Sequence, residues 1–238
     1  MEASPVRLMR PLTEVVREAA RIGLTPTRRN VAHWLSWAIT LASILVLTVL
    51  VARSGIFGWE EDLARELQSV DYPRWAFKIT SSSLESPTSW QGALVWAGAV
   101  ALLALWRMRL DAALAALTLP FHILGNFPKA IVDRARPSEV FDGIMSADKS
   151  FASGHAEFAI TFFGFLAYVA FIRLKSPALR ICLVVAWLSF VALVGFGRIN
   201  NGNHWPLDVL GGYVVGIGLL SGLIWLRTSL RGALSDAE

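Results

Sequence analysis

His204 and Asp208 are spaced as a nucleophile and its orienting carboxylate. They lie four residues apart, and Pro206 between them suits the first turn of a helix. At this spacing the carboxylate can accept a hydrogen bond from one ring nitrogen of the histidine, which fixes the tautomer and leaves the other nitrogen able to attack. Because such pairs on helices are more often structural, this one needs support from other residues.

The tripeptide Ser153–Gly154–His155 opens an apolar run and predicts an anion site. Ser153 is expected to cap the helix that follows, and the amides of the first turn then point outward at the positive end of the helix dipole. Gly154 lets an anion approach the backbone closely. A protonated His155 on this turn could donate its proton to a leaving oxygen.

Three basic residues could hold the same anion. Lys129 and Arg136 are seven residues apart, which predicts two turns of one helix and a shared face, with Pro137 ending that helix. Arg136 can make a paired fork contact with phosphate, whereas Lys129 acts as a point charge. Arg198 precedes an expected turn at residues 199–203 and can reach back toward the same site.

Together these groups fit phosphoryl transfer. One histidine would attack phosphorus, the other would protonate the leaving oxygen, and the cations would hold the equatorial oxygens. Each cluster alone has an ordinary explanation as an interface anchor, a helix cap or a structural pair. Nine specified residues in this order and spacing, however, should arise by chance in roughly one sequence per million or fewer. The single cysteine, Cys182, rules out a metal site that is built from cysteines.

The composition is that of a polytopic membrane protein. Apolar residues make up 55% of the 238 residues and charged residues 17%, against roughly 25% charged in average soluble proteins. Six apolar segments are long enough, or nearly so, to cross a bilayer as helices. They span residues 31–52, 90–106, 112–128, 153–172, 181–196 and 209–226. We therefore expect an all-α fold, a six-helix transmembrane bundle.

The distribution of Lys and Arg predicts the orientation of this bundle. With the N-terminus in the cytoplasm and six crossings, 13 of the 22 Lys and Arg residues fall on the cytoplasmic side and nine on the other. Both termini are then cytoplasmic, and all three polar clusters lie at the extracytoplasmic face of the cell membrane. The net charge of +4 is explained by this orientation, so a nucleic-acid partner is not indicated.

The chain is expected to have three parts. These are a cytoplasmic segment at residues 1–30, the membrane domain at 31–228 and a cytoplasmic tail at 229–238. Within the first part, residues 10–24 have the spacing of an amphipathic helix that lies on the inner leaflet, although a partly ordered tail also fits. Residues 55–89 form a polar extracytoplasmic connection with a short helical stretch at 60–70.

Two further polar residues lie near the clusters. Glu157 is one turn into the helix that carries His155, where it could tune that histidine, contact a substrate headgroup or be a polar residue near the surface. His122 lies seven residues before Lys129 and could face the same way, but a satisfied core histidine is the favoured interpretation.

The three clusters resemble the motifs of the type 2 phosphatidic acid phosphatase family, in its integral membrane branch, which shares its core with vanadium haloperoxidases. In order, the motifs read Lys129 to Arg136–Pro137, then Ser153–Gly154–His155, then Arg198 to His204 to Asp208. Every internal spacing matches, and the motif-bearing core covers about residues 90–226. Ala152 and Gly197 depart from the usual proline and serine, and the second change is expected to remove one hydroxyl contact to phosphate.

The resemblance implies a metal-independent phosphatase. By motif position, His204 would form a phosphohistidine, Asp208 would orient it, and His155 would act as general acid and then as base for the water. The phosphate-binding residues would be Lys129, Arg136, Arg198, Ser153 and Gly154.

The predicted function is hydrolysis of the phosphomonoester or diphosphate of a lipid or polyprenyl substrate. Its expected partners are the lipid bilayer and the phosphorylated lipid, with no cofactor and no obligate protein partner. Two alternatives stay open. The first is a phosphotransferase that moves the phosphoryl group to another lipid or sugar; the second is an inactive membrane scaffold or transporter, against which the intact polar clusters argue.

Overall fold

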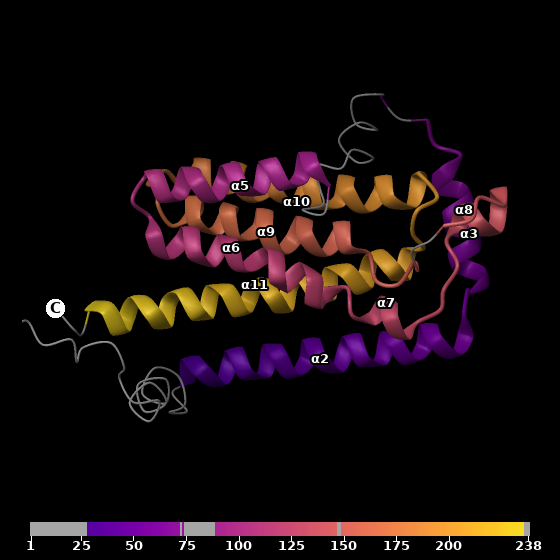
Figure 1. Cartoon of the computed structure of the whole chain (residues 1–238), viewed down its shortest axis with the longest axis horizontal. Helices are drawn as coiled ribbons and strands as arrows, with labels where there is room; N and C mark the ends of the chain where they lie inside the picture. Colours follow the sequence, from indigo (N-terminus) through magenta and orange to yellow (C-terminus); the bar gives the residue numbers. More distant parts are fainter. Residues whose placement is uncertain (1–27, 72, 74–88, 147–148, 236–238) are drawn as a thin grey trace, which may run out of the picture.

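The chain folds into helices. The computed structural model describes residues 28–71, 73, 89–146 and 149–235, and in these ranges it contains nine helices and no strand (Figure 1). They are α2 (Arg28–Ser54), α3 (Gly58–Gln68), α5 (Trp90–Leu105), α6 (Arg109–Gly125), α7 (Pro128–Ile131), α8 (Pro137–Asp142), α9 (Gly154–Phe171), α10 (Pro177–Asn200) and α11 (Pro206–Ser235). The all-α prediction is confirmed.

The long helices of the described residues, α2, α5, α6, α9, α10 and α11, run along one common direction and form a bundle (Figure 1). Five of them, α2, α6 with α7, α9, α10 and α11, contain apolar stretches long enough to cross a membrane. The sixth, α5, is shorter at 16 residues but equally apolar. Each of the six apolar segments expected from the sequence lies on one of these helices, because an α-helix satisfies its own backbone hydrogen bonds in lipid.

The central element of the bundle is α9, which packs against α6, α10 and α11. Its side chains Phe158, Phe162 and Phe165 are fully buried, and the rings of Phe158 and Phe162 stack with centroids 4.8 Å apart. Because three helices pack against α9, the position of its first turn is fixed. That turn carries the predicted anion site.

A glycine allows α11 to approach the start of α9. A Cβ atom on Gly212 would lie 2.3 Å from the carbonyl oxygen of Ser153 and 3.0 Å from Cβ of Ala156, so a larger side chain does not fit. At the same contact, the amide of Ser153 donates to the carbonyl of Asp208 at 2.9 Å. This close packing places the helix cap of α9 directly beside the first turn of α11.

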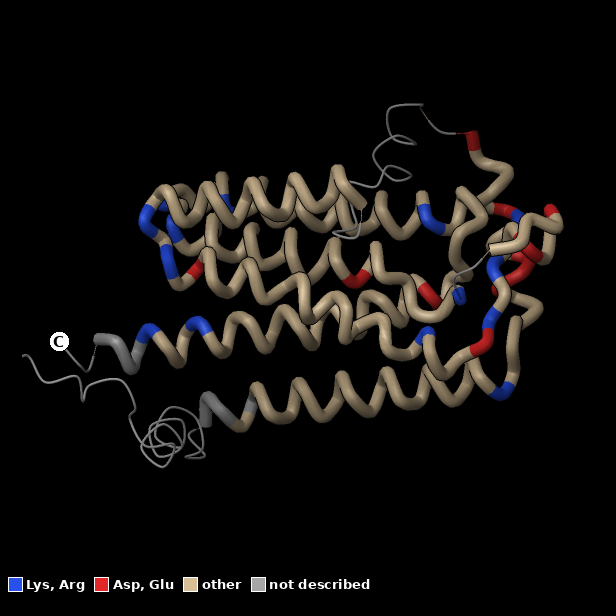
Figure 2. Tube along the Cα trace, in the orientation of Figure 1, with Lys and Arg blue, Asp and Glu red and all other residues tan. Residues whose placement is uncertain are grey.

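Charged residues gather at the two ends of the bundle, and the helical stretches between the ends contain few of them (Figure 2). At the end opposite α3 and α8, Asp111 is fully buried and pairs with Arg173 and Arg227, each at 2.5 Å. A buried carboxylate is costly unless it is paired and hydrogen-bonded. These ion pairs therefore fix α6, the end of α9 and α11 relative to one another at that end.

The other end of the bundle is covered by α3 and α8 (Figure 1). The chain turns from α2 toward α3 at Gly55, whose φ of +65° is a left-handed conformation that glycine adopts readily. The side chain of Asn200 donates to the carbonyls of Leu67 at 2.6 Å and Val70 at 2.9 Å, which holds α3 against the end of α10. The short helix predicted at residues 60–70 is confirmed, with slightly earlier bounds.

Lys129 and Arg136 do not lie on one helix face, so that prediction is wrong. The helix α7 ends at Ile131, and residues 132–136 are not helical. Pro137 begins α8 rather than ending a helix. The physical reason is that proline disfavours the helical conformation in the residue before it, while its own fixed φ suits the first position of a helix.

Two predictions for the ends of the chain fall at or beyond the limits of the structure. The amphipathic helix expected at residues 10–24 lies outside the described residues. The segment expected as a tail at 229–238 is helical as far as Ser235, because α11 continues into it and no proline interrupts the chain there.

Candidate active site

The three motifs meet at the end of the bundle that α3 and α8 cover. In Figure 1, α7, the end of α10 and the starts of α9 and α11 all lie toward this end. The amide of His204 donates to the carbonyl of Arg198 at 3.1 Å, so the intervening turn folds back on itself. The side chains that act electrostatically on His155 include those of Arg198, His204 and Lys129. The structure thus brings the predicted residues together.

His204 is oriented by a backbone carbonyl. Its side chain is almost fully buried, and its Nδ1 lies 2.9 Å from the carbonyl oxygen of Ser150. A carbonyl oxygen can only accept a hydrogen bond, so Nδ1 carries the proton and Nε2 carries the lone pair. This is the tautomer that an attack through Nε2 requires.

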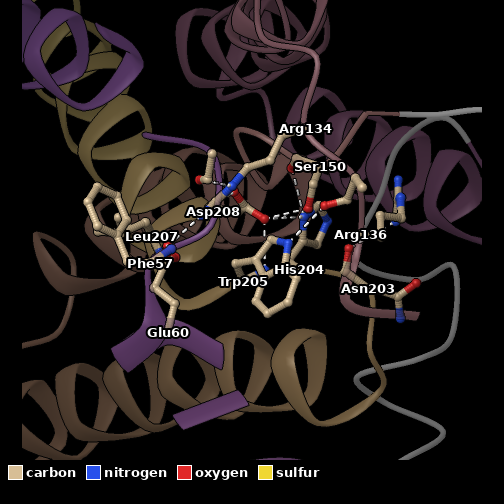
Figure 3. Close-up of polar contacts among 12 residues, drawn as sticks. Phe57, Glu60, Arg134, Arg136, Ser150, Asn203, His204, Trp205, Leu207 and Asp208 are labelled. Carbon is tan, nitrogen blue, oxygen red and sulfur yellow. Dashed lines mark hydrogen bonds and ion pairs between the residues drawn. The ribbon is translucent and has the colours of Figure 1, made fainter. Parts of the chain in front are cut away.

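Asp208 lies behind His204 at a distance too long for the expected hydrogen bond. Its Oδ2 is 3.8 Å from Nδ1 of His204. The carboxylate instead accepts from the amide of Trp205 at 2.7 Å, from a guanidinium nitrogen of Arg134 at 2.5 Å and from the hydroxyl of Ser150 (Figure 3). In this geometry Asp208 acts on His204 by its charge, and the ring orientation comes from Ser150.

Burial lowers the pKa of His204 from its ordinary value of 6.5 to about 3. The cations Arg198 and Arg136 act in the same direction, whereas Asp208 opposes them. His204 is therefore neutral at neutral pH, with its lone pair available. The nearby carboxylate would lower the cost of the positive charge that the ring would gain in a nucleophilic attack.

Arg134 is a part of this site that the sequence analysis missed. Its side chain is 2% exposed and pairs with Asp208 and Glu60, each at 2.5 Å. The sequence did contain a signal that could have identified Arg134. Because Pro137 favours an extended chain before it, and residues two apart in an extended chain face the same side, Arg134 is expected to lie on the side of Arg136.

Ser150 and Glu60 were missed as well, for different reasons. Ser150 acts on His204 through its main-chain carbonyl, for which no side-chain pattern exists. Glu60 is the third residue of α3, and its carboxylate reaches back to the amide of Phe57 at 3.3 Å. An acid at this position indicates helix capping, which gives no hint of a contact with the motifs.

The segment Ser153–Gly154–His155 forms the predicted helix start. Ser153 is the N-cap of α9 in an extended conformation, but its side chain makes no capping hydrogen bond. Its hydroxyl oxygen is buried and has no hydrogen-bond partner among the described residues. An unsatisfied buried hydroxyl is rare, and this one keeps its hydrogen-bonding capacity available at the predicted anion site. Gly154 also packs closely against the end of α6, since a Cβ there would lie 2.8 Å from Oδ1 of Asn126.

Arg136 and Arg198 flank the turn that precedes His204. One guanidinium nitrogen of Arg136 donates to the carbonyl of Asn203 at 3.2 Å. The amides of Asn203 and His204 both donate to the carbonyl of Arg198, each at 3.1 Å. Two cations beside a neutral imidazole create a positive potential, which suits a phosphate.

His122 and Glu157 form a buried pair within the bundle. Nδ1 of His122 lies 2.6 Å from Oε2 of Glu157, and the hydroxyl of Thr161 donates to Oε1 at 2.6 Å. The interpretation of His122 as a satisfied core histidine is confirmed. The possibility that Glu157 lies near the surface is wrong, because only 2% of the residue is exposed. The pair joins α6 to α9 close to the predicted anion site.

The family model described as PAP2 superfamily matches residues 110–231, slightly more than half of the chain. The chain belongs to the PAP2 superfamily. All three motifs lie inside the matched region, and the family resemblance drawn from them is confirmed. The matched region begins at the start of α6, whereas the motif-bearing core was expected to begin near residue 90.

Curated relatives are similar to this PAP2 protein over part of their length. The "Putative undecaprenyl-diphosphatase YbjG" of Escherichia coli (strain K12) is 40% identical over 82 residues, which cover 34% of this chain and 37% of that protein. The "Lipid A 1-phosphatase" of Rhizobium johnstonii is 31% identical over 119 residues, which cover 45% of each. The matches therefore span less than half the length of these relatives.

Two solved structures share the fold of this PAP2 protein. A transmembrane PAP2 type phosphatidylglycerolphosphate phosphatase from Bacillus subtilis has a TM-score of 0.67 at 18% identity, over 81% of this chain and 96% of that chain. LpxE from Aquifex aeolicus has a TM-score of 0.53 at 22% identity, over 72% and 96%. At these identities the likeness concerns the fold, and it confirms the predicted transmembrane bundle.

Proposed function

We propose that this protein is a membrane lipid phosphatase that forms a phosphohistidine on His204. The observation that carries the proposal is the buried, neutral imidazole of His204, whose tautomer is set by the Ser150 carbonyl and which lies beside Arg136 and Arg198. A neutral nucleophile among cations suits attack on an anionic phosphoryl group. Relatives that are named as an undecaprenyl-diphosphatase and a lipid A 1-phosphatase support the same chemistry.

In the first step, the Nε2 lone pair of His204 attacks phosphorus and forms an N–P bond. The bond from phosphorus to the leaving oxygen breaks, and a protonated His155 gives its proton to that oxygen. Three cations hold the remaining phosphoryl oxygens and stabilise the charge that develops there. They are Lys129, Arg136 and Arg198, assisted by the Ser153 hydroxyl and the Gly154 amide.

In the second step, water hydrolyses the phosphohistidine. His155, now neutral, accepts a proton from the water as its oxygen attacks phosphorus, and the N–P bond breaks. His204 regains its Nε2 lone pair and His155 its proton, so both residues return to their starting state. The products are the dephosphorylated lipid and inorganic phosphate.

The substrate of this reaction is an amphiphile with a phosphomonoester or diphosphate group. Its tail remains among lipid chains beside apolar helices while the phosphate reaches the polar end of the bundle. We place the protein in the cell membrane, with cytoplasmic termini and an extracytoplasmic site, because the Lys and Arg distribution favours this orientation. The proposed partners are the lipid bilayer and the phosphorylated lipid, with no obligate protein partner and no cofactor.

Phosphate release from a panel of lipid phosphates tests this function. Purified full-length protein in detergent is given phosphatidate, phosphatidylglycerol phosphate, a polyprenyl diphosphate and lipid A phosphate, with glycerol 3-phosphate as the soluble control. We expect inorganic phosphate from at least one amphiphile and far less from the control. Labelled phosphate that appears on a second lipid instead of in solution would indicate a transferase, and no release from any of them overturns the proposal.

Chelation of metal ions is expected to leave the activity largely intact. The positive charge at the site comes from Lys129, Arg136 and Arg198, so the phosphoryl oxygens have stabilising partners without a divalent cation. Phosphate release is measured with and without excess EDTA on the same protein preparation. A loss of activity that Mg²⁺ restores contradicts this expectation.

A further inference from the structure

One buried arginine links the catalytic end of α11 to a carboxylate outside the region that defines the family. Arg134 uses all three of its nitrogens: Nε donates to the carbonyl of Gly55 at 3.2 Å, and the two terminal nitrogens pair with Asp208 and Glu60 at 2.5 Å each (Figure 3). Glu60 belongs to α3, well before residue 110, where the family match begins. The planar fork of the guanidinium is suited to hold two carboxylates at fixed positions.

Glu60 has no exposed surface, and its partners lie on both sides of the junction between α3 and α11. Besides Arg134, its carboxylate accepts from the amide of Leu207 at 3.0 Å and from the amide of Phe57 at 3.3 Å. Leu207 lies in the first turn of α11, next to Asp208. Glu60 therefore holds the start of α11 twice, once directly and once through Arg134.

The far end of α3 is anchored close to the same site. Asn200, which donates to the carbonyl of Leu67, is the last residue of α10 and stands immediately before the turn that leads to His204. The side chain of Gln68 donates to the carbonyl of Ile199 at 3.4 Å. With both of its ends tied to the segments that carry the nucleophile, α3 holds Glu60 in a defined place.

The charges of this cluster add an electrostatic role. If Arg134 paired with Asp208 alone, the two charges would largely cancel, and Asp208 would do little for His204. Because Glu60 shares the guanidinium, the three groups keep a formal net charge of −1 beside His204. When Nε2 attacks phosphorus, the imidazole becomes cationic, and in a buried site a nearby negative charge stabilises it strongly.

We propose that Glu60 is a positioning residue for phosphoryl transfer, acting through Arg134 on Asp208 and so on the charge that develops on His204. The inference rests on the proposed phosphatase function. It predicts that Glu60 changes the rate of the chemical step more than the affinity for substrate, although it touches no substrate.

A matched pair of variants on α3 tests the proposal. Glu60→Gln keeps the shape and removes the charge, while Glu61→Gln makes the same change at the exposed neighbour that pairs with Arg65. With the best substrate of the wild type, we expect kcat of Glu60→Gln to fall by about 10- to 100-fold, the size of effect known for outer hydrogen-bonding partners in metal sites. The KM of Glu60→Gln should stay close to wild type, and Glu61→Gln should match wild type in kcat, KM and melting temperature. Rapid-quench labelling should show slower formation of the phosphohistidine.

Arg134→Lys provides a second, independent test. A lysine keeps the charge and both carboxylates but cannot span them with a planar fork, so a similar loss of kcat is expected. Because Glu60 acts through Arg134, the double variant Glu60→Gln/Arg134→Lys should be little slower than the slower single variant. If Glu60→Gln yields no folded protein, Glu60→Asp is used instead. This variant keeps the charge but shortens the side chain by one methylene, and the same loss of kcat is expected.

The outcomes separate the two proposals. Suppose that the wild type is active. The role of Glu60 is then overturned if folded Glu60→Gln or Arg134→Lys keeps the wild-type kcat, or if the two losses simply multiply in the double variant. The phosphatase function stands in either case. A wild type that releases no phosphate from any lipid overturns the proposed function and the role of Glu60 with it.

Discussion

His204→Ala is expected to abolish phosphate release while the protein remains folded. Without Nε2 no phosphohistidine can form, and the loss of a nucleophile costs at least about 10⁴-fold in kcat. The fold should persist, because the side chain makes one hydrogen bond to the Ser150 carbonyl and the helices pack independently of it. The measurement is phosphate release from the best substrate, together with size-exclusion chromatography and a melting curve in detergent.

A matched control removes another histidine. His33 lies on α2, away from the motifs, so His33→Ala should retain normal turnover. His204→Asn keeps a hydrogen-bond donor for the Ser150 carbonyl without supplying a nucleophile, and it should be as inactive as the alanine variant. Turnover near the wild-type level in either His204 variant would show that another group attacks phosphorus.

His155→Ala should slow both steps of the reaction and cause the phosphoenzyme to accumulate. General acid–base catalysis contributes typically about 10²- to 10⁴-fold, and His155 is proposed to serve as the acid in the first step and as the base in the second. After rapid quenching with labelled substrate, the variant should retain an acid-labile, alkali-stable phosphoryl group on the protein.

The leaving group separates the two roles of His155. An aryl phosphate releases a phenolate that needs little protonation, so His155→Ala should form the phosphoenzyme from it at a rate close to wild type. The hydrolysis step should remain slow, and a burst of phenolate followed by slow turnover is expected. If the variant forms the phosphoenzyme equally fast from alkyl and aryl phosphates, His155 is not the proton donor.

Local patterns were enough to predict the helices. A run such as residues 31–52 must satisfy its backbone groups within itself in lipid, so a helix is the available structure, and α2 covers it. The start of α9 was predicted from Ser153 followed by a long apolar run, and the helix begins at the next residue. Both predictions needed only the spacing of nearby residues.

The backbone conformation around the first motif could not be predicted from local spacing in this way. A spacing of seven residues between Lys129 and Arg136 is equally consistent with one helix or with two short helices and a link. Pro137 can follow the end of a helix or begin one. The structure contains the second arrangement, with a non-helical segment at residues 132–136 that turns Arg134 toward Asp208.

The sequence by itself determined the all-α membrane bundle, the family and the residues proposed to transfer phosphate, because these depend on apolar runs and on short, fixed spacings. Only the tertiary structure decided what holds those residues in place. His204 takes its orientation from Ser150, 54 residues away, and Asp208 shares Arg134, 74 residues away, with Glu60. Such contacts depend on how whole helices pack, and the local spacing of residues carries no information about that packing.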